Sequence, residues 1–276
     1  MNKDKTILKT LLLGSFFASL SALLGGSTFV FTRYVVDSID PYTLSFLRYG
    51  LTGLILFLLS ISVYMNKKFA KADLIPMCFL GLAMITLFPN FMALGLEHTT
   101  AARAGLLYAT MPLCTIIIAY FFNIEKITLN KSLAVLLAIL GVSFCMSERV
   151  DNNFHDTLKG DFLMMIGVLS ASCFTVFSGK YLKKYGNIPV MIFVILIGTI
   201  LNLIISMIFG NSITSLLEIN KFEAAALLML IIPGGVVMMY CWGKALQLIS
   251  PTQAAISLGF NPLSAILLGS VIPVSY

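Results

Sequence analysis

Long apolar stretches separated by short polar connections dominate this chain of 276 residues. A helix needs roughly 20 mostly apolar residues to cross a bilayer, and each stretch is long enough, although the fifth is marginal. The runs are too long, and alternate too little, for the strands of a membrane barrel. The nine stretches lie near residues 11–31, 42–64, 74–96, 101–122, 127–146, 161–179, 188–209, 222–243 and 252–273. The pattern predicts an all-α membrane protein, a polytopic helical bundle.

The composition agrees with a lipid environment. Hydrophobic residues make up 59% of the chain, charged residues 11%, and the mean hydropathy is +0.97. A soluble domain is about 45–50% apolar and about 25% charged. These values exclude a disordered chain, a collagen-like fibre and a nucleic-acid binder, so no nucleic-acid partner is expected despite the net charge of +6.

Lysine and arginine are sorted by side of the predicted membrane. With a cytoplasmic N-terminus, the inner segments hold twelve of them and the outer segments five, while Arg48 lies inside a span. Cytoplasmic loops usually carry the positive excess. We therefore expect an integral membrane protein of the bacterial inner (plasma) membrane with its N-terminus in the cytoplasm.

The second half of the chain echoes the first. Residues 93–102 (ALGLEHTTAA) resemble residues 245–254 (ALQLISPTQA) at an offset of 245 − 93 = 152, and Pro112 matches Pro262 at an offset of 150. Spans 1–4 thus correspond to spans 6–9, and an odd number of spans per unit inverts the second unit. Inverted repeats are typical of secondary transporters, with the substrate site near the membrane midplane. The expected units are a first repeat over 1–146, an outer loop over 147–160 and a second repeat over 161–276.

Four stretches carry a further signal through their order and spacing. They are Gly26–Val30, Asp40–Tyr49, Ala93–Pro112, and Glu125–Thr128 followed by Gly141 and Val142. In these stretches the chain resembles the EamA-like branch of the drug/metabolite transporter superfamily. The resemblance implies a carrier of two five-helix repeats, with both termini cytoplasmic and a central cavity for a small polar or amphipathic metabolite.

The number of spans departs from this family pattern. The resemblance implies ten helices, whereas the printed sequence ends at Tyr276 after the ninth stretch. We expect that the second repeat lacks its final helix through truncation, with a true nine-span variant as the alternative.

Arg48 lies inside the second stretch, seven residues beyond Pro41 and therefore about 10 Å along a helix. A charge at that depth is costly and usually faces protein or water. Arg48 either attracts a substrate carboxylate or phosphate, or has a structural role through backbone carbonyl groups. Both roles stay open on the sequence, and the structural one is favoured.

Other polar and aromatic residues inside the stretches are the remaining candidates for substrate contact. Packing is the stronger interpretation for the small hydroxyl residues, whereas a wet cavity is an equal interpretation for Asn90 and Asn261. Trp242, the only tryptophan, has an interfacial anchor as its alternative, and Tyr108 aligns with Phe260. Asn202 belongs to the same intramembrane set. The proposed substrate-binding residues are Ser27, Thr28, Arg48, Asn90, Tyr108, Thr175, Tyr240, Trp242 and Asn261.

Two prolines at matching positions are candidate hinges. Pro112 and Pro262 occur in spans 4 and 9, and proline removes a helix hydrogen bond and bends the axis. Ordinary membrane-helix proline is an equally good interpretation.

The sequence favours a carrier over an enzyme. It contains no HExxH, GxSxG or P-loop pattern and only two histidines, so we expect no cofactor, no metal and no catalytic residue. The predicted function is a secondary transporter, with export as the expected direction, of small metabolites such as amino acids or related compounds. The alternatives are a membrane-embedded enzyme and a non-transporting sensor or assembly protein. The expected partners are the metabolite and the lipid bilayer, with a homodimer left open.

Overall fold

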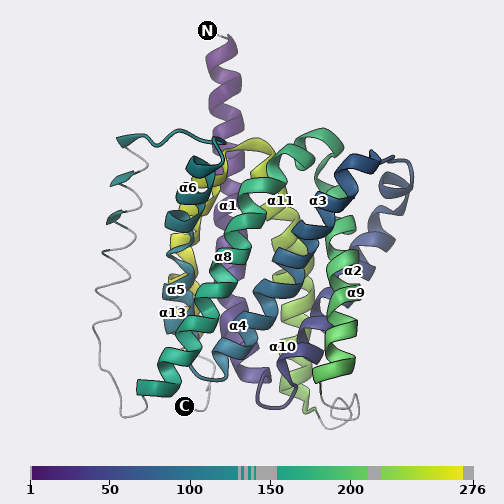
Figure 1. Cartoon of the computed structure of the whole chain (residues 1–276), viewed down its shortest axis with the longest axis vertical. Helices are drawn as coiled ribbons and strands as arrows, with labels where there is room; N and C mark the ends of the chain where they lie inside the picture. The colour runs from purple at the N-terminus through teal and green to yellow at the C-terminus, as the bar shows by residue number, and fades with distance from the viewer. Residues whose placement is uncertain are drawn as a thin grey trace.

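A computed structural model describes residues 2–129, 132–133, 136–137, 140, 154–210 and 219–269. Its helices lie side by side along one axis, and the amino-terminal end of α1 projects beyond the bundle (Figure 1). Most of the fifth predicted stretch, 127–146, and the chain end, 270–276, fall outside the described residues.

The described part of the chain is helical, which confirms an all-α polytopic membrane protein. Seven helical stretches are long and apolar enough to cross a membrane: Thr6–Val35, Pro41–Met65, Lys71–Leu96, Arg103–Phe121, Leu158–Tyr185, Asn187–Phe209 and Lys221–Leu248. They correspond to seven of the nine predicted stretches, namely all except the fifth and the ninth. That ninth stretch forms α12 (Pro251–Ile256), the 3₁₀ segment η4 (Ser257–Phe260) and α13 (Asn261–Gly269).

The first half is built from α1 (Asn2–Val35), α2 (Pro41–Met65), α3 (Lys71–Gly81), η1 (Leu82–Leu87), α4 (Phe88–Leu96), α5 (Ala101–Tyr108) and α6 (Met111–Phe121). The second half continues with α8 (Phe154–Tyr185), α9 (Asn187–Phe209), α10 (Lys221–Ile231), η3 (Ile232–Val237) and α11 (Met238–Leu248). Both η1 and η3 are π-helical turns, which interrupt their helices and are frequent at functional sites.

Helix starts follow the local sequence. Asp40 caps α2 by accepting the backbone N–H groups of Tyr42 at 3.1 Å and Thr43 at 3.0 Å, with Pro41 at the first helical position. Asn220 and Glu223 form a capping box at the start of α10. These caps fix where two of the membrane helices begin.

Helix boundaries in the second half recur at a constant distance from those in the first. Each of α10, η3, α11, α12 and α13 begins 150 residues after α3, η1, α4, α5 and α6, respectively; for α10 and α3 the difference is 221 − 71. The ends of α1 at Val35 and α8 at Tyr185 are separated by the same distance. These elements of the two halves therefore follow the same order, with their starts at the same spacing along the chain.

The start of α8 corrects one expectation. The segment 147–160 was expected to be a loop, but Phe154–Gly160 already belongs to α8. Polar residues there extend the helix beyond the apolar run because a helix satisfies its own backbone hydrogen bonds in water as well as in lipid. The rest of that segment lies outside the described residues.

α1 and α13 are in close contact at Gly26. A Cβ atom on Gly26 would lie 1.9 Å from Ser264 Oγ and 2.2 Å from the carbonyl oxygen of Asn261. Only glycine leaves room for that backbone contact, which brings Asn261 against α1.

Candidate functional site

A small cavity lies between the two halves. Its volume is about 20 Å³, enough for one water molecule. Residues of α1, η1, α4 and α5 form one side and residues of α11, η4 and α13 form the other. The lining residues are Ser21, Gly25, Thr28, Phe29, Met84, Phe88, Tyr108, Met238, Met239, Trp242, Leu258 and Asn261. The structure thus brings together four of the nine predicted site residues, namely Thr28, Tyr108, Trp242 and Asn261.

Two of these residues carry buried polar atoms without a hydrogen-bond partner. Asn261 is fully buried, and neither its Nδ2 nor its Oδ1 has a partner; the same is true of Trp242 Nε1. Buried polar groups are normally paired because leaving them unpaired is costly. Thr28 Oγ1 instead donates to the carbonyl of Gly25 at 2.7 Å. The cavity therefore offers an amide and an indole N–H to a polar ligand.

An aromatic wall stands opposite these groups. The ring of Tyr108 stacks on Phe88 with centroids 5.2 Å apart and meets Phe29 edge-on at 5.5 Å, two arrangements that aromatic rings prefer. Phe260, the residue that aligns with Tyr108 in the sequence, is 44% exposed and does not line the cavity.

Trp242 is not an interfacial anchor. Its side chain is 3% exposed and faces the cavity from α11. The alternative interpretation relied on its place near the end of an apolar run, but the turn of α11 after η3 directs this residue inward.

Arg48 lies behind the cavity rather than in its wall. It is 2% exposed, and its Nη2 donates to the carbonyl of Gly234 in η3 at 3.0 Å. Its guanidinium also lies 5.0 Å from the ring centroid of Tyr49. Because a π-helical turn disturbs the usual carbonyl pairing, this contact supports the structural role for Arg48.

Asn90 is engaged in a polar network away from the cavity. Its Nδ2 donates to the carbonyl of Thr86 at 2.7 Å and to Oδ1 of Asn202 at 2.8 Å. Asn202 Nδ2 in turn donates to the carbonyl of Ile85 at 2.8 Å. Pro89 lacks the N–H that would reach that carbonyl in a helix, so Asn202 on α9 supplies the missing donor.

The other predicted residues also lie outside the lining. Ser27 Oγ donates to the carbonyl of Leu24 at 2.6 Å within its own helix. Thr175 is fully buried with an unpartnered hydroxyl, and Tyr240 is 36% exposed. Sequence reasoning missed Ser21, because small hydroxyl residues inside membrane helices usually serve packing. It also missed three lining methionines, because an apolar residue in an apolar run carries no signal of its own.

Both candidate hinge prolines directly follow an interruption. Pro112 lies in the first turn of α6, after the break at Ala109 and Thr110, and Pro262 lies in the first turn of α13, after η4. The residues on either side of these breaks include Tyr108 and Asn261. Any bending at the prolines would therefore move the cavity wall.

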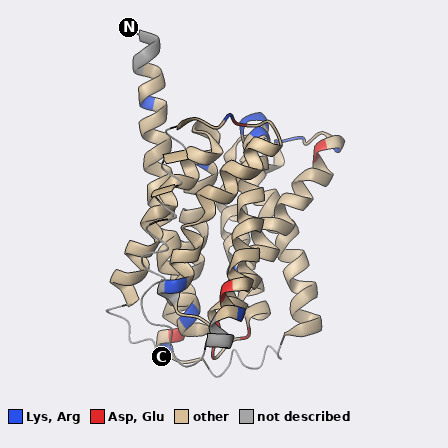
Figure 2. Ribbon diagram, turned by 60° about the vertical axis from the view of Figure 1, so that its left-hand side comes forward, with Lys and Arg blue, Asp and Glu red and all other residues tan. Residues whose placement is uncertain are grey.

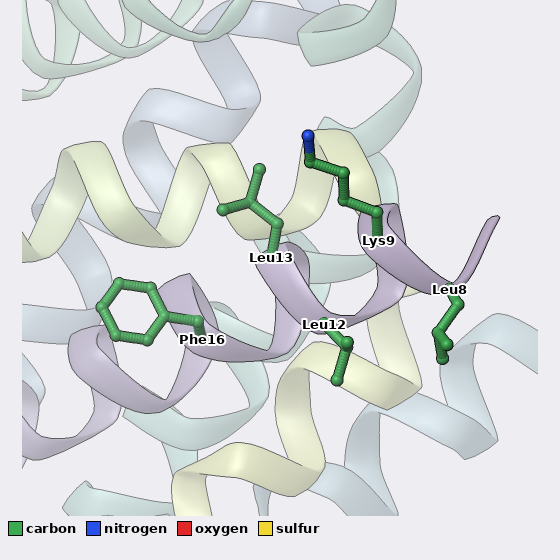
Figure 3. Close-up of a pocket in the computed structure, with 5 residues that line it drawn as sticks. All are labelled: Leu8, Lys9, Leu12, Leu13 and Phe16. Atoms are coloured by element: carbon green, nitrogen blue, oxygen red, sulfur yellow. The ribbon is translucent and has the colours of Figure 1, made fainter. Parts of the chain in front are cut away.

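A larger surface hollow of about 430 Å³ lies on α1 near its amino-terminal end (Figure 3). Its five lining residues, Leu8, Lys9, Leu12, Leu13 and Phe16, all belong to this one helix. It is the exposed apolar face of a membrane helix and contains none of the predicted site residues. Among the described residues, no three His, Cys, Asp or Glu side chains gather as they would around a metal ion.

Membrane-spanning helices around a small, mostly apolar cavity that carries a few unpaired polar groups define an integral membrane protein with the architecture of a solute carrier. The chain belongs to the EamA-like transporter family, whose profile matches residues 12–147 and again residues 158–273. This membership confirms the resemblance seen in the sequence motifs.

Individual relatives agree with the family. An uncharacterized transporter of Archaeoglobus fulgidus is 27% identical over 89% of this chain and 84% of its own length. The uncharacterized transporter YrdR of Bacillus subtilis is 22% identical over 94% of this chain and 83% of its length. One solved crystal structure superposes with a TM-score of 0.72 over 97% of this chain and 89% of that chain, at 15% identity, which shows a shared fold.

Proposed function

We propose that this protein is a secondary carrier that exports small metabolites such as amino acids or related compounds. Two inverted repeats, 1–146 and 161–276, would alternate in exposing the central cavity to each side of the membrane. Three findings support the proposal: membership of a transporter family, helix boundaries that recur 150 residues apart, and a cavity between the two halves.

Asn261 carries the proposal. Its amide offers a donor and an acceptor, while Trp242 Nε1 offers a second donor. The amino and carboxyl groups of an amino acid need both kinds of partner, and the aromatic and methionine walls suit an apolar side chain. Arg48, one residue layer behind the cavity at Gly234, makes the surroundings favourable for a carboxylate.

Counterflow in proteoliposomes tests this site. Vesicles are preloaded with one unlabelled amino acid at a time and are then given the same amino acid labelled with ¹⁴C. For at least one amino acid, the vesicles should accumulate the label. Asn261→Leu should reduce the accumulation about tenfold or more, because hydrogen bonds to charged groups contribute about 1.5–3 kcal/mol. Leu263→Ala, on the lipid-exposed side of the same helix, is the matched control and should transport normally. Absence of counterflow with every amino acid would contradict the substrate class, and uptake into inside-out vesicles checks the direction.

The proposed orientation places the connection after α2 in the cytoplasm and the start of α10 outside. In a cysteine-free background, Lys221→Cys should react with a membrane-impermeant maleimide in intact cells, whereas Lys67→Cys should react only in inside-out vesicles. Both positions are exposed, so accessibility differs only by side. The reverse labelling pattern would overturn a cytoplasmic N-terminus.

A further inference from the structure

The long helix α8 is tied to the first half of the chain at each of its ends. Near its start, Asp161 accepts a forked contact from Arg103 of α5: Arg103 Nε lies 3.0 Å from both carboxylate oxygens, and Nη2 lies 2.6 Å from Oδ2. Asp161 is only 8% exposed. Such charge-assisted bidentate contacts are stronger than single ion pairs.

A second tie is made at the other end of α8. Lys184 Nζ and the hydroxyl of Tyr185 both donate to Asp73 Oδ2 on α3, at 2.7 Å and 2.5 Å. The same hydroxyl accepts the backbone N–H of Ala70 at 3.1 Å, which fixes its orientation. The end of α8 is therefore held against the start of α3.

The two ties lie on opposite faces of the membrane. Asp161 and Lys184 are 23 residues apart on one helix, a distance of about 35 Å at 1.5 Å per residue, which exceeds the hydrocarbon thickness of about 30 Å. Charged residues gather toward the two ends of the bundle, as Figure 2 shows. With both ties made, the cavity has a volume of about 20 Å³, which is room for about one water molecule and not for a metabolite.

The carboxylate of Asp73 has a counterpart at the same register in the other half. Glu223 is the third residue of α10, as Asp73 is of α3, and it accepts the hydroxyl of Ser38, just past the end of α1. Each half thus presents an acidic residue to a hydroxyl donor from the end of the other half's first helix. The two faces differ in one respect. On the face with Glu223 and Ser38, Asp161 of α8 also accepts the forked contact from Arg103.

We propose that Arg103–Asp161 and Asp73–Lys184–Tyr185 are alternating latches, one for each face. Either face can open only if α8 separates from its partner there, so the tie on that face breaks while the other holds. This inference rests on the proposed carrier function, because it assigns the ties to the two openings of that carrier.

Side-specific labelling of the cavity tests the latches. In a cysteine-free background, Met239→Cys places a reporter in the cavity wall, and a membrane-impermeant methanethiosulfonate is added from one side of sealed vesicles. Asp161→Asn should raise the labelling rate about 5- to 30-fold from the Arg103 side and lower it from the other side. This fold-change corresponds to a shift of about 1–2 kcal/mol in the equilibrium between the two openings. Asp73→Asn should do the reverse.

Two controls separate a latch from a static brace. Asp37→Asn makes the same charge change in a pair, Arg33–Asp37, that is local to the end of α1, and it should leave both rates unchanged. Exchanging the charges through Arg103→Asp with Asp161→Arg should restore the original rates.

Equal increases on both sides, or no change on either side, would overturn the latch assignment. The readout needs no substrate, so its failure is distinguishable from failure of the carrier proposal: counterflow with unresponsive labelling refutes the latches alone. Side-specific labelling without counterflow of any amino acid refutes only the substrate class.

Discussion

Adding one methyl group at Gly26 should destabilise the protein by about 3 kcal/mol, the upper end of the usual cost of overpacking. The new carbon would collide with the carbonyl oxygen of Asn261 at 2.2 Å, and a backbone atom cannot turn away as a flexible side chain can. α1 and α13 would have to separate. We therefore expect Gly26→Ala to lower the unfolding midpoint in detergent by roughly 6–12 °C.

The single tryptophan gives a direct measurement of this effect. Trp242 is buried in the cavity wall, so its emission should shift to longer wavelength as the protein unfolds. Gly259→Ala is the matched control, since a Cβ there would meet nothing within 4 Å. Equal midpoints for the two variants would show that α1 and α13 do not depend on this contact.

Asn202→Leu should have the next largest effect, a loss of about 2 kcal/mol. It leaves the carbonyl of Ile85 without a donor, which costs about 1–3 kcal/mol for a buried group, and it removes one partner of Asn90. Interhelical hydrogen bonds in membranes contribute about 0.6 kcal/mol on average, so the penalty comes mainly from the unpaired carbonyl. Unfolding followed by Trp242 emission measures the change.

The Asn90–Asn202 contact also predicts the stability of the double variant. Asn90→Leu combined with Asn202→Leu should cost about 1 kcal/mol less than the sum of the two single changes, because the residues share one contact. Thr199→Val on the same helix removes a hydroxyl that has no partner and should be nearly neutral. Strict additivity of the two asparagine changes would contradict the Asn90–Asn202 contact.

The fold was predictable from the sequence because the bilayer imposes helices on any long apolar run. The site was only partly predictable, as the two asparagines illustrate. Asn90 and Asn261 look equivalent in sequence, but Asn90 is paired with Asn202, which lies 112 residues away, and Asn261 has no partner. For Arg48 the sequence favoured a contact with backbone carbonyl groups, but it did not reveal that the carbonyl is that of Gly234, 186 residues away.

Ion pairs between the two halves were not predictable from the sequence. The sequence assigns Asp73 and Lys184 to one side of the membrane, but their contact depends on two helix ends that the fold brings together. The helical start of α8 escaped prediction for a related reason: polar composition signals exposure to water, and an exposed segment can still be helical.

Three unbranched thioether side chains, those of Met84, Met238 and Met239, form part of the cavity wall. Methionine has three rotatable bonds and a polarizable sulfur, so it repacks around differently shaped neighbours at low cost. The cavity volume of about 20 Å³ can therefore change as these methionine side chains adopt other rotamers. Such plasticity, combined with the fixed amide of Asn261, would let a single carrier accept a range of molecular shapes while demanding the same polar head from each.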